Sequence, residues 1–172
     1  DFILGVPGCQ SLADDLHKLV TRYPLAHVSA YFLTLEENTP MQKAVSQGLL
    51  ADPADIEADE LYEVRDALVA AGFEHYEISN HARSGRRCQH NLNYWYQGDY
   101  IGFGPAAVSS SNGIRLANPP DLGRWLADEP ATVEQLSATD RRNEHLMLRL
   151  RLLQEGLDLA DFEQRFGTQP AD

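Results

Sequence analysis

Cysteine is scarce in this chain, because Cys9 and Cys88 are the only two among 172 residues. A secreted domain built on disulfides carries more cysteines than this. Neither CxxC nor CxxxCxxC occurs, so these residues alone cannot hold an iron–sulfur cluster. His75 and His81 have no third ligand at the spacing typical of a zinc site. The sequence therefore argues against a disulfide scaffold and against a self-contained metal centre.

Basic residues and long apolar runs are also in short supply. The chain has 14 Lys and Arg against 26 Asp and Glu, a formal net charge of −12. Nucleic-acid binding depends largely on cations that neutralise phosphates, so a nucleic-acid partner is not expected. No apolar run approaches the roughly 18 residues that a membrane span needs, so no span is expected. Because no signal peptide is visible, the sequence predicts a cytoplasmic protein.

Two common catalytic patterns are missing as well. The glycine-rich residues 98–105 contain neither GxGxxG nor a phosphate loop with a following Lys, so a tight turn is the simplest interpretation of them. No nucleophile elbow is present, so a Ser-His-Asp triad cannot be argued. The sequence therefore assigns no catalytic residue.

The first 80 residues alternate between strand-like and helix-like patterns. Short apolar runs end at turn residues, and the segments between them repeat their apolar positions at helical spacing. This alternation predicts an α/β protein with parallel strands, in a barrel or an open wound sheet. The expected strands are residues 2–6, 28–33 and 73–78, and the expected helices are residues 12–23, 41–50 and 56–71.

After residue 80 the pattern changes. Residues 82–89 are polar and predict an exposed loop, whereas residues 91–118 predict turns and hairpin-like strands. Pro119 and Pro120 mark a boundary, after which the chain turns helical. We expect helices at residues 122–127, 132–136, 139–153 and 159–166, with Thr139 as an N-cap and the arginines of residues 141–151 on a solvated face.

Residues 88–96 form the densest group of polar and aromatic side chains. His90 and two Asn lie beside Tyr94, Trp95 and Tyr96, in a stretch without helical or strand periodicity. An imidazole can ligate a metal or a haem iron, and aromatic rings offer flat faces to a planar ligand. The alternative is an aromatic loop that packs on the protein, with His90 bonded to the backbone.

Five motifs, in the same order and spacing, resemble one protein family. Residues 1–8 (DFILGVPG) resemble its DLIYGLPG segment, and residues 29–40 resemble its SAYxLT and GTP segments. Residues 76–83 (YEISNHAR) resemble YEISNFAR, and residues 98–105 (GDYIGFGP) resemble GDYLGIGP. Residues 90–95 match HNxxYW, the signature of the HemW branch. The chain thus resembles the oxygen-independent coproporphyrinogen III oxidase family of radical S-adenosylmethionine (SAM) proteins, in its HemW (haem chaperone) branch.

The resemblance implies the C-terminal part of a partial (β/α)6 radical-SAM barrel, followed by the start of a helical domain. Residues 1–118 would form the barrel portion with the HNxxYW loop, and residues 119–172 would begin the helical domain. In the family, an N-terminal CxxxCxxC binds a [4Fe–4S] cluster that works with SAM. This sequence lacks that half and starts without Met in a strand-like run, so we expect a fragment.

Site residues follow from the resemblance by position. Asp1, Thr34 and Val108 match places that contact SAM in the coproporphyrinogen-oxidising branch. Two departures weaken this match, because Ala106 and Val108 replace the Gly and His of the family's GAHS motif. His81 also replaces the usual Phe.

The HNxxYW match implies a haem-binding signature made of His90, Asn91, Tyr94 and Trp95, with His90 as the candidate iron ligand. Three functions stay open at this point. The first is haem binding and delivery to an acceptor protein. The second is SAM-dependent oxidative decarboxylation by a coproporphyrinogen III oxidase, which is an enzyme. The third is an inactive structural half-domain, because half a barrel leaves strand edges uncovered.

Overall fold

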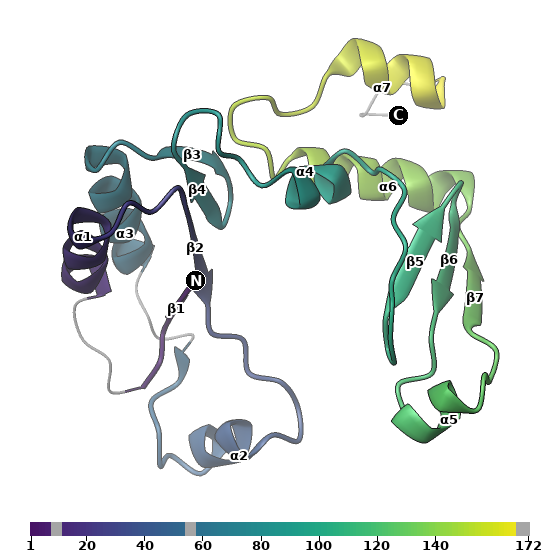
Figure 1. The fold of residues 1–172 in the computed structure, drawn as a ribbon, viewed down its shortest axis with the longest axis horizontal. Helices are drawn as coiled ribbons and strands as arrows, with labels where there is room; N and C mark the ends of the chain where they lie inside the picture. The colour runs from purple at the N-terminus through teal and green to yellow at the C-terminus, as the bar shows by residue number, and fades with distance from the viewer. Residues whose placement is uncertain (8–11, 54–57, 168–172) are drawn as a thin grey trace. The chain divides into compact units, whose positions relative to one another are not determined.

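The computed structural model describes residues 1–7, 12–53 and 58–167. Ser11, whose side chain is of the type that caps a helix expected from residue 12, lies outside these ranges. Contacts divide the chain into two compact units, Asp1–Cys88 and Gln89–Asp172. Each unit combines helices with a small sheet (Figure 1), so the protein is mixed α/β as expected.

The first unit contains a four-stranded sheet with the strand order β1-β2-β4-β3. β1 and β2 run parallel, with Phe2 opposite Ala30 and Leu4 opposite Phe32, while β4 is antiparallel to both of its neighbours. The elements of this unit are β1 (Phe2–Leu4), α1 (Leu12–Arg22), β2 (His27–Phe32), α2 (Pro40–Ser46), α3 (Ala58–Ala70), β3 (Glu74–Glu77) and β4 (Asn80–Ala82).

The core of the first unit lies where α1 and α3 cover the strands. Leu16 of α1 and Leu68 of α3 are fully buried, as is Leu4 of β1. Burial of one such side chain contributes about 1.5–3 kcal/mol. α1 and α3 are amphipathic, so their apolar faces form the layer that the sequence periodicity predicts. The remaining members of this cluster are Val20, Val28, Ala30, Val64 and Phe73.

The sequence predicted a third strand parallel to the first two, and this prediction is wrong. β3 does not pair with β2; the chain turns at residues 78–79 and returns as β4, which lies between β2 and β3. All three residues of β4 are buried, including Asn80 and His81. The hairpin forms because β4 supplies the antiparallel partner that both neighbours need for their backbone hydrogen bonds. Because residues 80–82 include polar side chains, the sequence pattern did not indicate that they form a buried strand.

The second unit contains an antiparallel three-stranded sheet with the order β5-β6-β7. Asn112 and Gly113 join β5 to β6, with φ of 53° and 78°. Positive φ at both positions is the hairpin turn that Asn-Gly favours. The elements are α4 (Gln89–Trp95), β5 (Val108–Ser111), β6 (Ile114–Ala117), α5 (Leu122–Leu126), β7 (Thr132–Gln135), α6 (Ala138–Arg149) and α7 (Leu159–Phe166).

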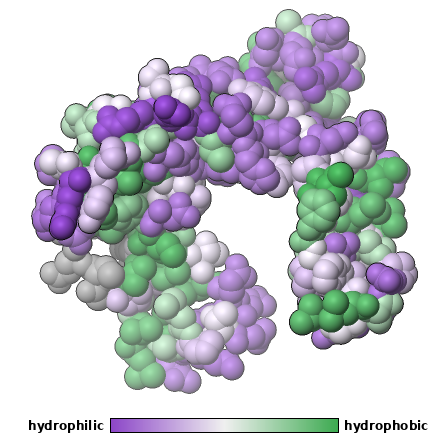
Figure 2. All heavy atoms as spheres, viewed as in Figure 1, coloured by the Kyte–Doolittle hydropathy of each residue, from purple (hydrophilic) through white to green (hydrophobic). Residues whose placement is uncertain are grey.

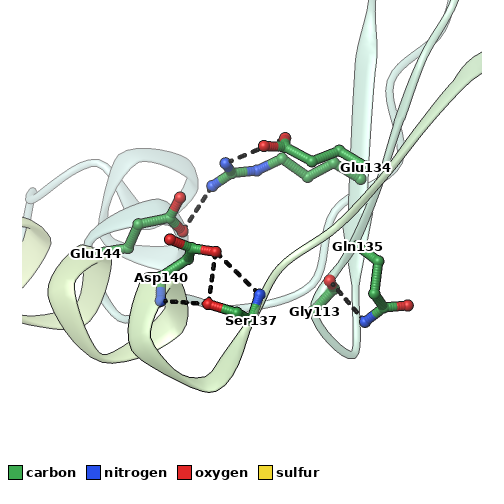
Figure 3. Close-up of polar contacts among 7 residues, drawn as sticks. Gly113, Glu134, Gln135, Ser137, Asp140 and Glu144 are labelled. Carbon is green, nitrogen blue, oxygen red and sulfur yellow. Dashed lines mark hydrogen bonds and ion pairs between the residues drawn. The ribbon is translucent and has the colours of Figure 1, made fainter.

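Two predictions for the segment that forms β7 and the start of α6 are wrong. Residues 132–136 do not form a helix, because Thr132–Gln135 pairs with β6 as strand β7. The N-cap of α6 is Ser137 rather than Thr139. Ser137 Oγ accepts from the Asp140 backbone N–H at 3.1 Å, and Asp140 accepts from the Ser137 backbone N–H at 3.0 Å (Figure 3). This reciprocal capping box fixes where α6 begins.

The two units meet at residues 88–89, whereas the sequence predicted a boundary after residue 118. Residues 89–118 make their contacts with the chain that follows them, through the β5–β6–β7 sheet and α6. The assignment of residues 1–118 to a barrel and residues 119–172 to a helical domain stays a prediction. Within the described ranges, none of the helices combines the length and the hydrophobicity that a membrane crossing requires.

The surface of the second unit is uneven in polarity. Figure 2 shows hydrophobic residues over the three-stranded sheet and α5, and mainly hydrophilic residues over α7. Leu116 and Val133 lie opposite each other on β6 and β7 and are both exposed. Leu122 and Leu126 of α5 are exposed as well. Among the described residues, the second unit has fewer buried apolar residues than the first.

Candidate functional site

The HNxxYW residues form a helix, which corrects the prediction of a loop. α4 spans Gln89–Trp95, and Leu92 anchors it because its side chain is buried. Two residues after the helix, Gln97 has a φ of 60°, and the Gly98 N–H donates to the Asn93 carbonyl at 2.8 Å. A Cβ at Gly98 would lie 2.1 Å from Asn93 Oδ1. The Gly98 of the GDY motif therefore closes the helix that carries HNxxYW.

His90 and Tyr94 stand one turn apart on the same face of α4. The Tyr94 hydroxyl and His90 Nε2 are 3.1 Å apart, and the two rings meet edge to face with centroids 4.8 Å apart. The ring of Tyr94 packs in the same way on Tyr100, at 4.7 Å. His90 is exposed, whereas Tyr94 is half-buried. The structure thus places an accessible imidazole and a fixed phenol side by side, which the sequence spacing of four predicts for a helix only.

The other two residues of the predicted haem set are more enclosed. Asn91 and Trp95 are both half-buried. The indole Nε1 of Trp95 is buried and has no hydrogen-bond partner among the described residues. The Arg151 guanidinium lies over the Trp95 ring, 4.2 Å from its centroid. Trp95 therefore packs against Arg151 while part of its side chain stays accessible, and its role in haem binding stays a prediction.

Arginines near the end of α6 pack on the aromatic residues of the α4 segment. Arg149 lies 4.9 Å above the Tyr96 ring, in addition to Arg151 over Trp95. Each such cation–π contact contributes about 0.5–2 kcal/mol, more when the pair is desolvated. The prediction that this arginine cluster forms a purely solvated helix face is therefore wrong for Arg149 and Arg151.

A cavity of about 260 Å³ lies next to Tyr94 within the second unit. α4, the turn after it, the β5–β6 hairpin and α6 line it, with Asp99, Tyr100, Arg141 and Glu144 among the lining residues. Sites that enclose a drug-sized ligand measure about 300–1,000 Å³. This cavity is thus too small to enclose a porphyrin, although it could receive a substituent from one edge.

Arg115 of β6 lines this cavity and pairs with two carboxylates. Its guanidinium donates to Glu144 at 2.7 Å and lies 3.7 Å from Glu134 (Figure 3). The hydrogen bond to Glu144 is the main reason that the pKa of Arg115 lies above its usual value. This ion pair connects β6 to α6, which keeps the wall of the cavity in place.

The residues predicted to contact SAM lie in both units. Asp1 precedes β1, and Thr34 follows β2; both are exposed. Because β1 and β2 are parallel with Phe2 opposite Ala30, Asp1 lies at the amino ends of these strands and Thr34 beyond their carboxyl ends, ~16 Å apart along the strand. Val108 begins β5 in the second unit. The structure does not bring Asp1 and Thr34 together, and their role stays a prediction.

The family's YEISN segment forms a polar layer in the β3–β4 hairpin. Glu77 is fully buried, and it accepts from the Ser79 N–H at 3.0 Å and from the Asn80 side-chain amide. Buried carboxylates are stable only when they are paired in this way. These contacts make Glu77 part of a hydrogen-bonded polar layer within the hairpin.

A pair of stacked histidines lies in the same hairpin, and the sequence analysis did not foresee it. His75 and His81 are opposite in the β3–β4 register, and their rings stack 4.1 Å apart and nearly parallel. His81 is buried, and neither ring nitrogen has a described partner. Burial, with smaller effects from His75 and His27, lowers the pKa of His81 to about 3. His81 therefore acts as a neutral flat ring, as the family's Phe would.

Metal sites built from the usual ligands are not found in the described part of the chain. No three His, Cys, Asp or Glu side chains there gather closely enough to hold a metal ion. Cys88 is half-buried and free of disulfides.

Comparisons with known proteins agree with the motifs. Residues 136–172 match the HemN C-terminal domain. The heme chaperone HemW of Mycobacterium tuberculosis is 39% identical over 170 residues, which cover 93% of this chain and 43% of that protein. The heme chaperone HemW of a Synechocystis strain is 37% identical over 164 residues, which cover 88% of this chain and 39% of that protein.

One solved structure matches the fold. It is the coproporphyrinogen III oxidase (HemN) from Escherichia coli, reported as a radical SAM enzyme, with a TM-score of 0.73 and 18% identity over 96% of this chain and 42% of that one. This chain thus spans less than half the length of the relatives it matches. On the identities to HemW over nearly its whole length, the chain belongs to the radical SAM coproporphyrinogen III oxidase family, in its HemW branch.

Proposed function

We propose that this chain is part of a HemW-like protein that binds haem on helix α4 and delivers it to an acceptor protein. The observation that carries the proposal is the exposed His90, hydrogen-bonded to Tyr94 on one face of α4. The names of the relatives support it, since several are called heme chaperones. The acceptor and the transfer step are parts of the proposal.

The geometry of α4 suits a ligand that is bound and then released. Haem is a large flat molecule whose iron needs a nitrogen, sulfur or oxygen ligand from the protein. His90 and Tyr94 offer such atoms at the surface, next to the ring of Tyr100. A site on an open helix face can be reached by an acceptor without prior unfolding, whereas haem in an enclosed cavity could not be handed over directly.

In the whole protein we propose the family's radical-SAM centre in addition to the haem site. The [4Fe–4S] cluster would be held by residues outside this sequence, and Asp1, Thr34 and Val108 are the positions proposed to contact SAM. The cluster with SAM would supply radical chemistry. The open edge of β1, at one end of its sheet, supports a barrel that continues beyond this strand. A cytoplasmic location belongs to the same proposal.

Absorbance titration with haemin tests the haem site. The full chain should shift the Soret band of haemin, and His90→Ala should weaken binding by about tenfold, as expected for the loss of one strong contact. His17→Ala is the matched control, because His17 is another exposed histidine, on α1 of the first unit. Equal affinity in His90→Ala and the unchanged chain would remove His90 from the site. A complete lack of binding would refute the proposal.

An assay of coproporphyrinogen III turnover distinguishes the oxidase alternative from haem delivery. The likeness to the E. coli enzyme, at 18% identity, concerns the fold. The whole protein, reconstituted with its cluster and SAM, should leave coproporphyrinogen III unchanged if haem delivery is its function. Release of carbon dioxide from the propionate groups would favour the oxidase instead.

A further inference from the structure

The cavity of about 260 Å³ in the second unit borders the helix of the proposed haem site. Tyr94 of α4 and Arg141 of α6 both line it. The cavity is too small for a porphyrin ring, so only a substituent at the edge of the ring can enter it. Haem carries two propionates at one edge, and each ends in a carboxylate. The charges around this cavity therefore bear on how haem is oriented.

Most charged groups around the cavity already have partners. Arg115 pairs with Glu144 at 2.7 Å. Asp99 accepts hydrogen bonds from a hydroxyl and a backbone N–H of the β5–β6 hairpin, at 2.8 and 3.3 Å. The guanidinium of Arg141 has no carboxylate within ion-pair distance among the described residues. Arg141 is therefore the cation at this cavity that can pair with an incoming anion.

The side chain of Arg141 lies against the turn of the β5–β6 hairpin. A Cβ at Gly113 would lie 3.0 Å from Arg141 Cδ and 3.6 Å from its Nε, so the glycine leaves the room that the arginine occupies. The backbone is held as well, because Gln97 Nε2 donates to the Arg141 carbonyl at 3.0 Å. Gln97 lies two residues after α4, so this bond keeps the start of α6 next to the proposed haem helix.

A second cavity, of about 250 Å³, makes the surroundings of Arg141 more cationic. Arg141, Arg142 and Arg165 line it, and its described lining residues include no Asp or Glu. Arg165 has a partner, since its Nε lies 2.7 Å from Asp161. Arg142 Nε is buried and has no hydrogen-bond partner within the described part of the chain. In a chain with a net charge of −12, this group of guanidinium side chains favours the binding of an anion here.

We infer that Arg141 binds a propionate carboxylate of haem and so orients the haem on α4, an inference that rests on the proposed haem binding. A guanidinium and a carboxylate can join through two parallel N–H···O hydrogen bonds, which fix direction as well as distance. No covalent bond forms or breaks in this contact. The ligand that the site selects is a porphyrin with free carboxylates, whichever side chain of α4 contacts the iron.

The exposure of Arg141 suits a carrier that must release its ligand. An exposed ion pair stabilises weakly and is screened by salt. Arg141 is exposed, so its contact adds little to the barrier that haem must cross to leave. The contact still distinguishes the propionate edge of the ring from the opposite edge, which has no carboxylate. Arg141 thus contributes orientation more than affinity.

Haemin and haemin dimethyl ester, titrated in the same solvent and followed at the Soret band, test the inference. The ester keeps the ring and the iron but has no free carboxylate. The full chain should bind haemin about fivefold more tightly than the ester, since only haemin can pair with Arg141. The net charge of the chain cannot produce this preference, because a chain of −12 disfavours the two carboxylates of haemin.

Variants of Arg141 connect that preference to one side chain. Arg141→Gln should weaken haemin binding about fivefold and leave the affinity for the ester unchanged, whereas Arg141→Lys should keep part of the haemin affinity. Arg124→Gln is the matched control, because Arg124 is an exposed arginine on α5 of the same unit, pairs with Glu129 and borders neither cavity. It should change neither affinity.

The outcomes separate this inference from the proposed function. Equal affinities of the unchanged chain for haemin and its ester would overturn the inference while haem binding stands. An equal loss for both ligands in Arg141→Gln, or a loss of the same size in Arg124→Gln, would overturn it as well. If the unchanged chain binds neither ligand, the proposed function itself fails, and this inference with it.

Discussion

The two units of this chain are stabilised in different ways. The first has one continuous apolar cluster between α1, α3 and the strands, with Leu16, Val64 and Leu68 fully buried. Among its described residues the second has fewer buried apolar side chains, such as Leu92 in α4 and Phe162 in α7, whose ring packs on Phe166. Two units of similar length thus differ in how many of their described apolar residues are buried.

Polar and aromatic contacts take the place of a large core in the second unit. Arg115 joins β6 to Glu144 of α6, and Arg149 and Arg151 stack on the aromatic residues of the α4 segment. A cation–π contact of about 0.5–2 kcal/mol stabilises less, on average, than the burial of a leucine at about 1.5–3 kcal/mol. The stability of the first unit should therefore fall most when apolar volume is removed, and that of the second when single polar or ring contacts are removed.

Leu68→Ala should give the largest effect and would sharpen this comparison. Leu68 is fully buried between α3 and the sheet, so the variant removes apolar contacts and leaves a cavity. The free energy of unfolding of the first unit should fall by about 3 kcal/mol. Urea denaturation, followed by circular dichroism, measures it. Leu49→Ala is the control, since Leu49 is 71% exposed and its loss should change little. Equal effects of the two variants would contradict the core described above.

The buried His81 should make the stability of the first unit depend on pH. This is the second-largest effect that we expect on the free energy of unfolding. The pKa of His81 is about 3 in the folded protein, against 6.5 when unfolded. Between these values the unfolded chain binds the proton and the folded chain does not, so stability falls as the pH drops below about 6.5. The free energy of unfolding should be about 2 kcal/mol lower at pH 5 than at pH 7 from this residue.

His81→Phe isolates that contribution. The variant places an uncharged ring against His75, so the part of the pH dependence that belongs to His81 should vanish while the stacked geometry is retained. Urea denaturation at both pH values measures it. The pKa of His27 is also lowered, chiefly by burial, so a smaller pH dependence should remain. A pH dependence that is the same in His81→Phe and in the unchanged chain would show that the proton binds elsewhere.

Sequence patterns predicted the elements that have strong periodicity. The helix expected at residues 159–166 is α7 with the same bounds, and the hairpin-like strands expected within residues 91–118 are present as β5 and β6, joined at Asn112 and Gly113. Both depend on local signals, an apolar stripe in one and a turn dipeptide in the other. The family motifs were also sufficient to predict the HemW branch, which the relatives confirm.

The failures of prediction have tertiary causes. Strands β4 and β7 are short and polar, and each is a strand because a neighbour offers it backbone partners, which no local pattern reveals. The seven residues of α4 are too few to show helical periodicity, and the helix depends on the buried Leu92 and the closing Gly98. The candidate haem residues could be predicted only by family resemblance. The contact of His90 with Tyr94 could not be predicted, because it depends on these residues forming a helix.

The smallest expected effect concerns a single stacked arginine in the second unit. Arg151→Ala removes the guanidinium 4.2 Å from the Trp95 ring, and the second unit should lose about 1 kcal/mol. The fluorescence of Trp95, read in a Trp125→Phe background, should change as water reaches the indole. Arg124→Ala is the control, because Arg124 pairs with Glu129 at an exposed site away from Trp95 and should leave its emission unchanged. A loss of several kcal/mol from Arg151→Ala would mean that this arginine organises a core, and the contrast between the two units would then disappear.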